Sequence, residues 1–208
     1  MIRSLRKLPP VLLWLVMVTA AGADFPGVSI APPAGSPWVQ VQDSAHSQVW
    51  MRNTGREDLT LGVALLTGPA PENLTEGSSF IDWVKRTKEH NPDPSRFRLV
   101  SNRIEPAEDD RPSCVRYATA VEDRSAGNVP AATLRLEVAG LACLHPDEPG
   151  RFIDVQYSAR MPSGATLPAE LRQEGEAFVD SVRFRPPPAD GDWSLGNRAA
   201  TPGRRQAT

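Results

Sequence analysis

The sequence predicts an α+β fold: an antiparallel sheet with two helices packed against it and one disulfide. Three observations predict this class. Most segments between turn-forming residues alternate apolar and polar side chains, as half-buried strands do. Two further segments repeat apolar residues at helical spacing. The two cysteines of the chain lie at matching ends of two neighbouring alternating segments. Short connections between these segments favour an antiparallel sheet with helices on it.

Length and composition allow one domain with a real core. The chain has 208 residues, of which 40% are hydrophobic, and domains commonly hold about 100–200 residues. The formal net charge is −2, and it becomes −5 once the three basic residues of segment 1–23, which holds no acid, are left out. A mildly acidic protein has no electrostatic reason to bind nucleic acid, so we exclude that class of partner.

The first 23 residues have the pattern of a cleavable signal peptide. Three basic residues precede an apolar stretch at 11–18, and Ala21-Gly22-Ala23 then supplies the small-x-small motif that a signal peptidase reads. We therefore predict cleavage between Ala23 and Asp24. The alternative is a membrane anchor, but the apolar run 11–23 is shorter than the about 20 residues that a membrane-spanning helix needs. The interpretation places the mature protein, without a transmembrane segment, in the periplasm or outside the cell.

The first half of the mature chain predicts three strands and a helix. Residues 38–42 and 48–52 have short patterns of alternating apolar and polar side chains, and residues 59–67 are more continuously apolar, which is typical of a strand covered on both faces. A helix begins near Ser79, which can cap it together with Asp82. Lys85, Arg86 and Lys88 suit the C-terminal half of this helix because of its dipole. The Asn-Pro-Asp-Pro sequence at 91–94 ends it.

The two cysteines fit a hairpin between segments 113–122 and 134–143. Both segments alternate, and the turn-rich stretch 123–130 separates them. If paired residue numbers sum to 257, the apolar positions share one face, Glu122 faces Arg135, and Cys114 faces Cys143. Directly opposed residues lie about 4.5–5.5 Å apart, which is within disulfide reach. Because export exposes the chain to an oxidising compartment, we predict a structural disulfide between these cysteines.

The second half predicts two more strands, a helix and a short last strand. Residues 97–104 are a further candidate strand, and residues 151–161 alternate apolar and polar side chains, so we expect the latter beside the hairpin. A helix beginning near Pro168 places Leu171, Ala177, Phe178 and Val182 on one side. It runs into a short strand at 182–185. The single domain then spans residues 24–186, and the proline-rich segment 187–208 is predicted to be a flexible tail.

The outline resembles the PsbP-like fold, which a subunit of the photosynthetic oxygen-evolving complex shares with small bacterial envelope proteins. The resembling features are the stretch VSIAPPAGSPW (Val28–Trp38), a helix in the middle of the chain, and a last helix that runs into FVDSVRF (Phe178–Phe184). They cover roughly residues 25–186. The resemblance implies a non-enzymatic binding, assembly or chaperone-like role, and it supplies no site residue.

Groups that carry chemistry are few in this sequence. Nucleophile elbows, glycine-rich phosphate loops and HExxH zinc motifs are absent. One cluster, His145-Pro146-Asp147-Glu148, offers an imidazole and two carboxylates to a metal ion. It directly follows a strand and precedes Pro149-Gly150, which is the composition of an ordinary polar turn. We therefore assign no catalytic residue, metal ligand or cofactor, and keep His145, Asp147 and Glu148 as metal-ligand candidates.

The sequence thus favours an exported, non-catalytic binding or assembly module that acts on a protein partner in the cell envelope. The partner would dock on a sheet face or in a groove beside a helix. The alternative is an envelope hydrolase or metal-binding protein with its site near His145.

Overall fold

The computed structural model describes residues 23–25, 27–31, 38–71, 74, 78–90, 93–107, 113–124 and 133–186. The predicted leader, apart from Ala23, and the predicted tail lie outside these residues. The helices are α1 (Ser78–Glu89) and α2 (Ala169–Asp180). The strands are β1 (Ala23–Phe25), β2 (Val28–Ile30), β3 (Trp38–Ser44), β4 (Ser47–Arg52), β5 (Thr60–Pro69), β6 (Phe97–Pro106), β7 (Cys114–Asp123), β8 (Leu134–His145), β9 (Glu148–Pro162) and β10 (Arg183–Phe184).

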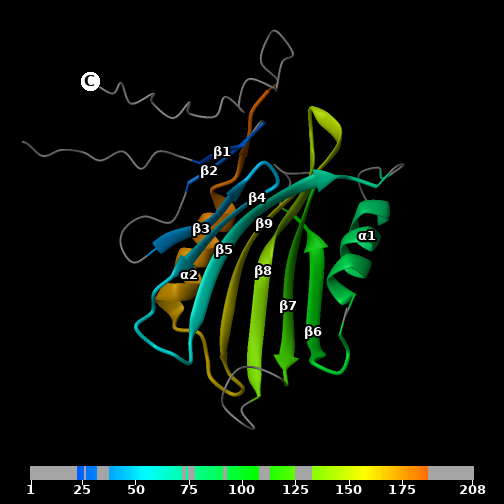
Figure 1. The fold of residues 1–208 in the computed structure, drawn as a ribbon. Coiled ribbons are helices and arrows are strands. Elements are labelled where there is room, and N and C mark those ends of the chain that lie inside the picture. Colours follow the sequence, from blue (N-terminus) through cyan, green and yellow to red (C-terminus); the bar gives the residue numbers. More distant parts are fainter. Residues whose placement is uncertain are drawn as a thin grey trace, which may run out of the picture.

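Seven strands form one large antiparallel sheet, as the alternation predicts. Their order is β3-β4-β5-β9-β8-β7-β6, so β3 and β6 are its two edges (Figure 1). Strand β9 lies beside β8, as predicted, and joins the hairpin to the earlier strands through its other neighbour, β5. Residues 61–65 of β5 are all buried, in agreement with a strand covered on both faces. Neither helix is long and apolar enough to cross a membrane.

The β7–β8 hairpin has the predicted register. Cys114 pairs with Cys143, and the pairing continues along both strands to Asp123 opposite Leu134. The two sulfur atoms form a disulfide with an S–S distance of 2.07 Å. Every pair in this ladder sums to 257, so the predicted disulfide and register are both confirmed.

The expected charge pair across this hairpin is not the one that forms. Glu122 does lie opposite Arg135, but its carboxylate accepts two hydrogen bonds from Arg98 of β6, at 2.6 and 2.9 Å. Arg135 instead contacts Glu137 at 2.9 Å. The prediction considered two strands only, and β6, which lies on the other side of β7, supplies the nearer guanidinium.

One face of the sheet packs against α2, and we call it the α2 face. Cys114, Leu141, Val155 and Val63 point to this face and join one core with Phe178 and other buried residues of α2. Successive residues of a strand point to opposite faces, so Val115, next to Cys114, belongs to the other side.

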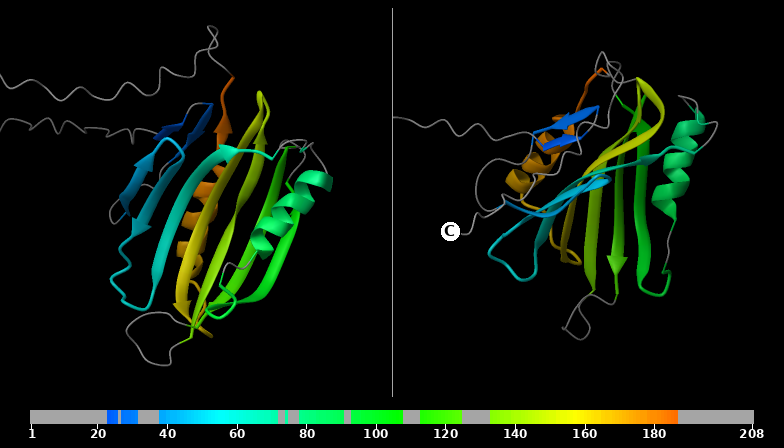
Figure 2. Two further views of the ribbon diagram at one scale, coloured as in Figure 1. Left: turned by 45° about the vertical axis from the view of Figure 1, so that its right-hand side comes forward. Right: turned by 45° about the horizontal axis from the view of Figure 1, so that its top comes forward.

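The opposite face, which we call the α1 face, carries α1 near β6 and β7. Phe80 and Val84 of α1 pack there against Val115, Tyr117 and Leu144 in a second, smaller core. The two helices therefore lie on opposite faces of the sheet (Figure 2). Strands β3, β4 and β5 have no helix on this face within the described residues.

A second, three-stranded sheet differs from the expected single sheet. Strands β1 and β10 both pair with β2, in the order β1-β2-β10. Val28 and Ile30 of β2 are buried in the α2-side core. Strands of three residues are too short to show an alternating pattern, which is why the sequence does not predict β1 or β2. The sequence predicts β10 only as the continuation of the last helix.

The apolar side of α2 also differs in one residue from the prediction. Leu171, Phe178 and Val182 are buried as expected, but Ala177 is exposed. Gly175 and Val179 complete the buried stripe instead. The spacing 171, 175, 178, 182 keeps to the steps of three and four residues that define one helix side, and Ala177 falls outside it.

Candidate functional site

A cleft of about 410 Å³ opens on the α2 face, between α2 and strands β6, β7 and β8. One row of paired residues forms its floor, running from Arg103 of β6 through Ala118 and Ala139 to Tyr157 of β9. The two alanines are short, so the floor is low between Arg103 and the helix. The volume falls within the range of about 300–1,000 Å³ that is typical of ligand pockets.

The helix side of the cleft comes from one stripe of α2. Arg172, Glu176 and Asp180 follow one another at intervals of four residues, and all three line the cleft. Gly175 sets how closely α2 approaches the floor, because a Cβ atom there would lie 2.5 Å from Cγ of Tyr157. A glycine at this position lets the tyrosine ring lie directly against the helix.

The walls of the cleft carry charges of both signs. The sheet contributes two guanidinium groups and one carboxylate, and the helix contributes one guanidinium and two carboxylates. Arg116 of β7 donates to Asp180 across the cleft at 2.8 Å, and Arg103 donates to Glu105 at 2.7 Å. Within the described residues, Glu176 forms no such ion pair.

These ion pairs can exchange partners at little cost. The side chains of Arg116 and Asp180 are 34% and 52% exposed, and solvent-exposed pairs contribute only about 0–1 kcal/mol. A ligand that brings its own carboxylate or ammonium group can therefore replace one member of a pair. The described lining includes no serine, cysteine or histidine, so the groups it offers suit charge pairing and hydrogen bonding.

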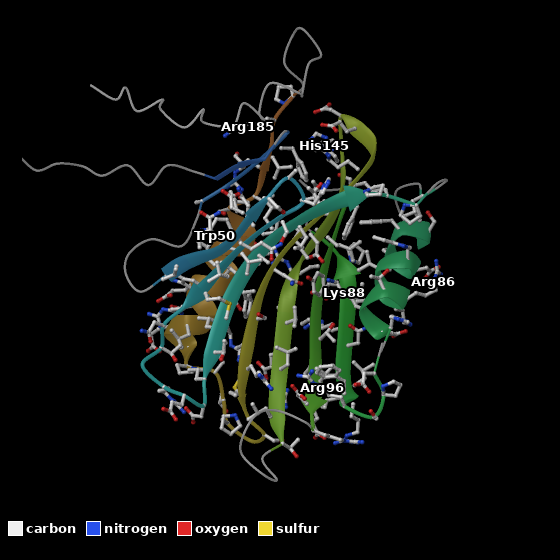
Figure 3. All side chains as sticks on the ribbon, viewed as in Figure 1. Trp50, Arg86, Lys88, Arg96, His145 and Arg185 are labelled. Atoms are coloured by element: carbon white, nitrogen blue, oxygen red, sulfur yellow. A yellow bond between two sulfur atoms is a disulfide. The ribbon has the colours of Figure 1, made fainter. Side chains whose placement is uncertain are left out.

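A buried polar network lies on the α1 face. Lys88 of α1 donates to Oδ2 of Asp154 at 2.6 Å (Figure 3), and its Nζ lies 3.8 Å from the centre of the Tyr117 ring. The Tyr117 hydroxyl donates to Oδ1 of Asp154 at 2.7 Å. The same hydroxyl oxygen lies 2.8 Å from the side-chain amide of Gln156. Because the one hydroxyl proton goes to Asp154, the Gln156 amide group turned by 180° about its last bond would donate its N–H to the hydroxyl oxygen.

Gly140 makes room for this network. It lies between Tyr117 and Gln156 in the ladder of β7, β8 and β9. A Cβ atom at position 140 would lie 2.7 Å from the Tyr117 hydroxyl oxygen and 2.5 Å from a backbone oxygen of β9. The phenol ring therefore passes over a glycine to reach its partners.

The two tyrosines of the chain are expected to resist ionisation in the folded protein. Burial, with the charge of Asp154 and the hydrogen bond to it, raises the pKa of Tyr117 well above its ordinary value, and burial also raises the pKa of Tyr157. Because the unfolded chain loses these protons near pH 10, stability is present below that pH and falls as pH rises above it.

A spectroscopic titration at 295 nm measures this directly. The native protein should show no tyrosinate step near pH 10, whereas the protein in concentrated urea should show the absorbance of two tyrosinates there. The variant Tyr117→Phe identifies which residue ionises last. A native step near pH 10 that disappears in Tyr117→Phe would contradict the burial of this hydroxyl.

His145 is a buried structural residue in the described fold. His145 is the last residue of β8 (Figure 3). Its buried side chain packs beside the ring of Phe184 of β10. Nε2 lies 2.9 Å from the carbonyl oxygen of Gly27, and Nδ1 accepts a hydrogen bond from the Asp147 N–H at 3.2 Å. The imidazole thus carries its proton on Nε2 and ties the β8–β9 turn to the small sheet.

The other members of the predicted cluster point elsewhere. Asp147 is exposed, and Glu148 accepts a hydrogen bond from Arg151 at 3.2 Å. Glu148 instead shares a concavity of about 350 Å³ with His46 of the β3–β4 turn. No group of three His, Cys, Asp or Glu side chains could hold a metal ion within the part of the chain that the structure describes.

No family model matches this chain. No curated protein matches it either. Function is therefore inferred from the geometry of the cleft and of the sheet.

Sequence reasoning missed the cleft, although part of its signal was present. The register of 257 already places Ala118 opposite Ala139, which marks a low point on one face of the hairpin. The spacing of Arg172, Glu176 and Asp180 marks a charged helix stripe. What the sequence could not supply is the packing of that stripe beside these alanines, because it depends on the angle at which α2 crosses the sheet.

Proposed function

We propose that the chain is an exported, non-catalytic binding or assembly module whose cleft beside α2 seats a charged segment of a protein partner. The observation that carries the proposal is the cleft itself: a low alanine floor between two walls that hold charges of both signs. Arg103 and Arg116 would bind a carboxylate of the partner, and Glu176 an ammonium or guanidinium group. A segment with both signs of charge satisfies both walls at once.

Export forms the second part of the proposal. The leader pattern at 1–23 motivates it, and the disulfide between Cys114 and Cys143 is compatible with an oxidising compartment. The mature protein would begin at Asp24 and act in the periplasm or outside the cell.

A PsbP-like assembly role is consistent with these features. Two of the three features behind the resemblance are a helix in the middle of the chain and a last helix that runs into a short strand, and α1, α2 and β10 have those places in the chain order. Much of the third, the stretch Val28–Trp38, lies outside the described residues. A cleft beside the last helix is a suitable seat for a partner in an assembly. The proposal therefore includes a PsbP-like fold.

Site-specific crosslinking tests the proposal in cells. A photoreactive amino acid at Arg103, on the cleft rim, should capture a protein partner from the periplasmic or secreted fraction, where the recovered chain should begin at Asp24. A synthetic peptide of the crosslinked partner segment is then titrated against the purified protein. Because the double variant Arg103→Gln, Arg116→Gln removes both sheet-side guanidinium groups, it should weaken binding at least tenfold, on the order of 1.4 kcal/mol.

The matched control is Arg56→Gln. Arg56 also forms an exposed ion pair, with Asp58 at 2.7 Å, but it does not line the cleft. Its replacement should leave the affinity unchanged. If the partner segment binds the double variant as tightly as the original protein, the cleft is not the docking site.

A further inference from the structure

The two edges of the large sheet differ in how well they are protected. The described chain exposes four large apolar side chains, and all four lie on edge strands: Val39 and Val41 on β3, Leu99 and Val100 on β6. Each pair lies at or beside a bulge, between Gln40 and Gln42 in β3 and between Leu99 and Ser101 in β6. Within the described residues, each edge strand thus has a strand partner on one side only and exposes valine or leucine.

Strand β6 is shielded against pairing with another strand. It carries Arg98 and Arg103, and α1 packs beside it, with Asn102 of β6 hydrogen-bonded to Glu89 of α1. Charged side chains, a bulge and a covering element are the devices that natural proteins use to keep sheet edges apart. Figure 1 shows α1 next to β6, whereas the contact of β3 with a helix is the hydrogen bond from Trp38 at its start to Glu174 of α2, at 3.4 Å.

Strand β3 has a bulge, as β6 does, but lacks basic residues. Its sequence WVQVQDS contains no lysine, arginine or proline, and Asp43, its one charged residue, accepts a hydrogen bond from Gln48 at 3.0 Å. Val39 and Val41 are 59% and 58% exposed. Val39 shares the open α1 face with its cross-strand neighbour Met51. An edge strand whose segment 38–42 is uncharged and exposes two valines is a template for pairing with a further strand.

We infer that β3 pairs antiparallel with β3 of a second copy of this chain, which makes a twofold homodimer with one continuous sheet. A ladder centred on Gln40 places Val39 opposite Val41 of the second copy, twice. The ladder covers residues 38–42 of each copy, and Asp43 lies outside this segment. The ladder therefore brings no two charged residues face to face. The opposed pairs are Val39 with Val41, Trp38 with Gln42 and Gln40 with Gln40, so no like charges meet in this twofold ladder.

The edges themselves favour a closed dimer over other arrangements. A second copy brings an equally long edge with the same uncharged segment 38–42, whereas a ladder between β3 and β6 would meet the arginines of β6 and the helix beside it. Head-to-tail pairing would also leave one β3 edge free and grow into a filament. Pairing of β3 with β3 uses both free edges and stops at two copies.

Sedimentation velocity over about 1–300 µM protein tests the inference. The original protein should show a concentration-dependent dimer. The double variant Val39→Lys, Val41→Lys places lysine opposite lysine at two positions of the ladder, and like charges directly opposite destabilise strand pairing. We expect it to weaken dimerisation at least tenfold, with an unchanged near-ultraviolet circular dichroism spectrum as evidence that it folds.

The matched control makes the same change on the other edge. Leu99→Lys, Val100→Lys alters the two exposed apolar residues of β6 and should leave the dimer intact. A second measurement uses Gln40→Cys, which places two cysteines at the twofold axis and should yield a covalent dimer on mild oxidation, whereas Ser101→Cys on β6 should not. A protein that stays monomeric over the whole range, or a dimer lost in the β6 variant alone, would overturn the inference.

Discussion

Replacing Lys88 with methionine is expected to lower the free energy of unfolding by about 3–5 kcal/mol. The ammonium group lies 2.6 Å from Asp154, and the two side chains are only 16% and 6% exposed. Removing the cation leaves a carboxylate buried in the sheet without a compensating charge. Methionine keeps most of the apolar length of lysine over the Tyr117 ring, so the loss reports the charge rather than a cavity. Urea unfolding followed by tryptophan fluorescence measures it.

Two further variants distinguish the contribution of the ion pair to stability from a general effect of replacing a lysine in α1. Lys85→Met changes an exposed lysine of the same helix and should alter stability by no more than about 0.5 kcal/mol. The double variant Lys88→Met, Asp154→Asn removes both charges, and the new amide still accepts a hydrogen bond from Tyr117. It should therefore recover most of the loss. An effect of Lys88→Met no larger than that of Lys85→Met would mean that Asp154 does not depend on this lysine.

The Lys88 pair illustrates where sequence reasoning ends. The sequence explains Lys88 as a cation near the C-terminal end of a helix, which is correct but incomplete. Asp154 is the one carboxylate in the alternating strand 151–161, and a buried carboxylate needs a cation or hydrogen-bond donors. The sequence does not say which cation, because the two residues are 66 positions apart and meet only once α1 lies on one particular face.

The hairpin illustrates the opposite case. Its register follows from the sequence because strand alternation, turn composition and two cysteines impose independent constraints on the same short segment, and one register meets them all. No comparable constraint fixes the order of distant strands. The placement of β9 between β5 and β8, the small sheet around β2, and the burial of His145 against Gly27 all depend on contacts between remote parts of the chain.

Removing the disulfide is expected to lower the free energy of unfolding by about 3–4 kcal/mol. The bond joins residues 29 positions apart, so it restricts the unfolded chain strongly and leaves the native hairpin almost unchanged. For a domain of this size the loss corresponds to a decrease in Tm of roughly 6–16 °C. Calorimetry of the double variant Cys114→Ala, Cys143→Ala against the oxidised protein measures it, and mass spectrometry of the oxidised protein should show the two cysteine peptides linked.

Reduction of the unaltered protein supplies the control. The reduced protein keeps both buried sulfur atoms, so its loss of stability comes from the cross-link alone, and any further loss in the alanine variant comes from the space left in the α2-side core. The alanine variant itself should no longer respond to a reductant. If the reduced and oxidised proteins unfold at the same temperature, the bond does not stabilise the fold.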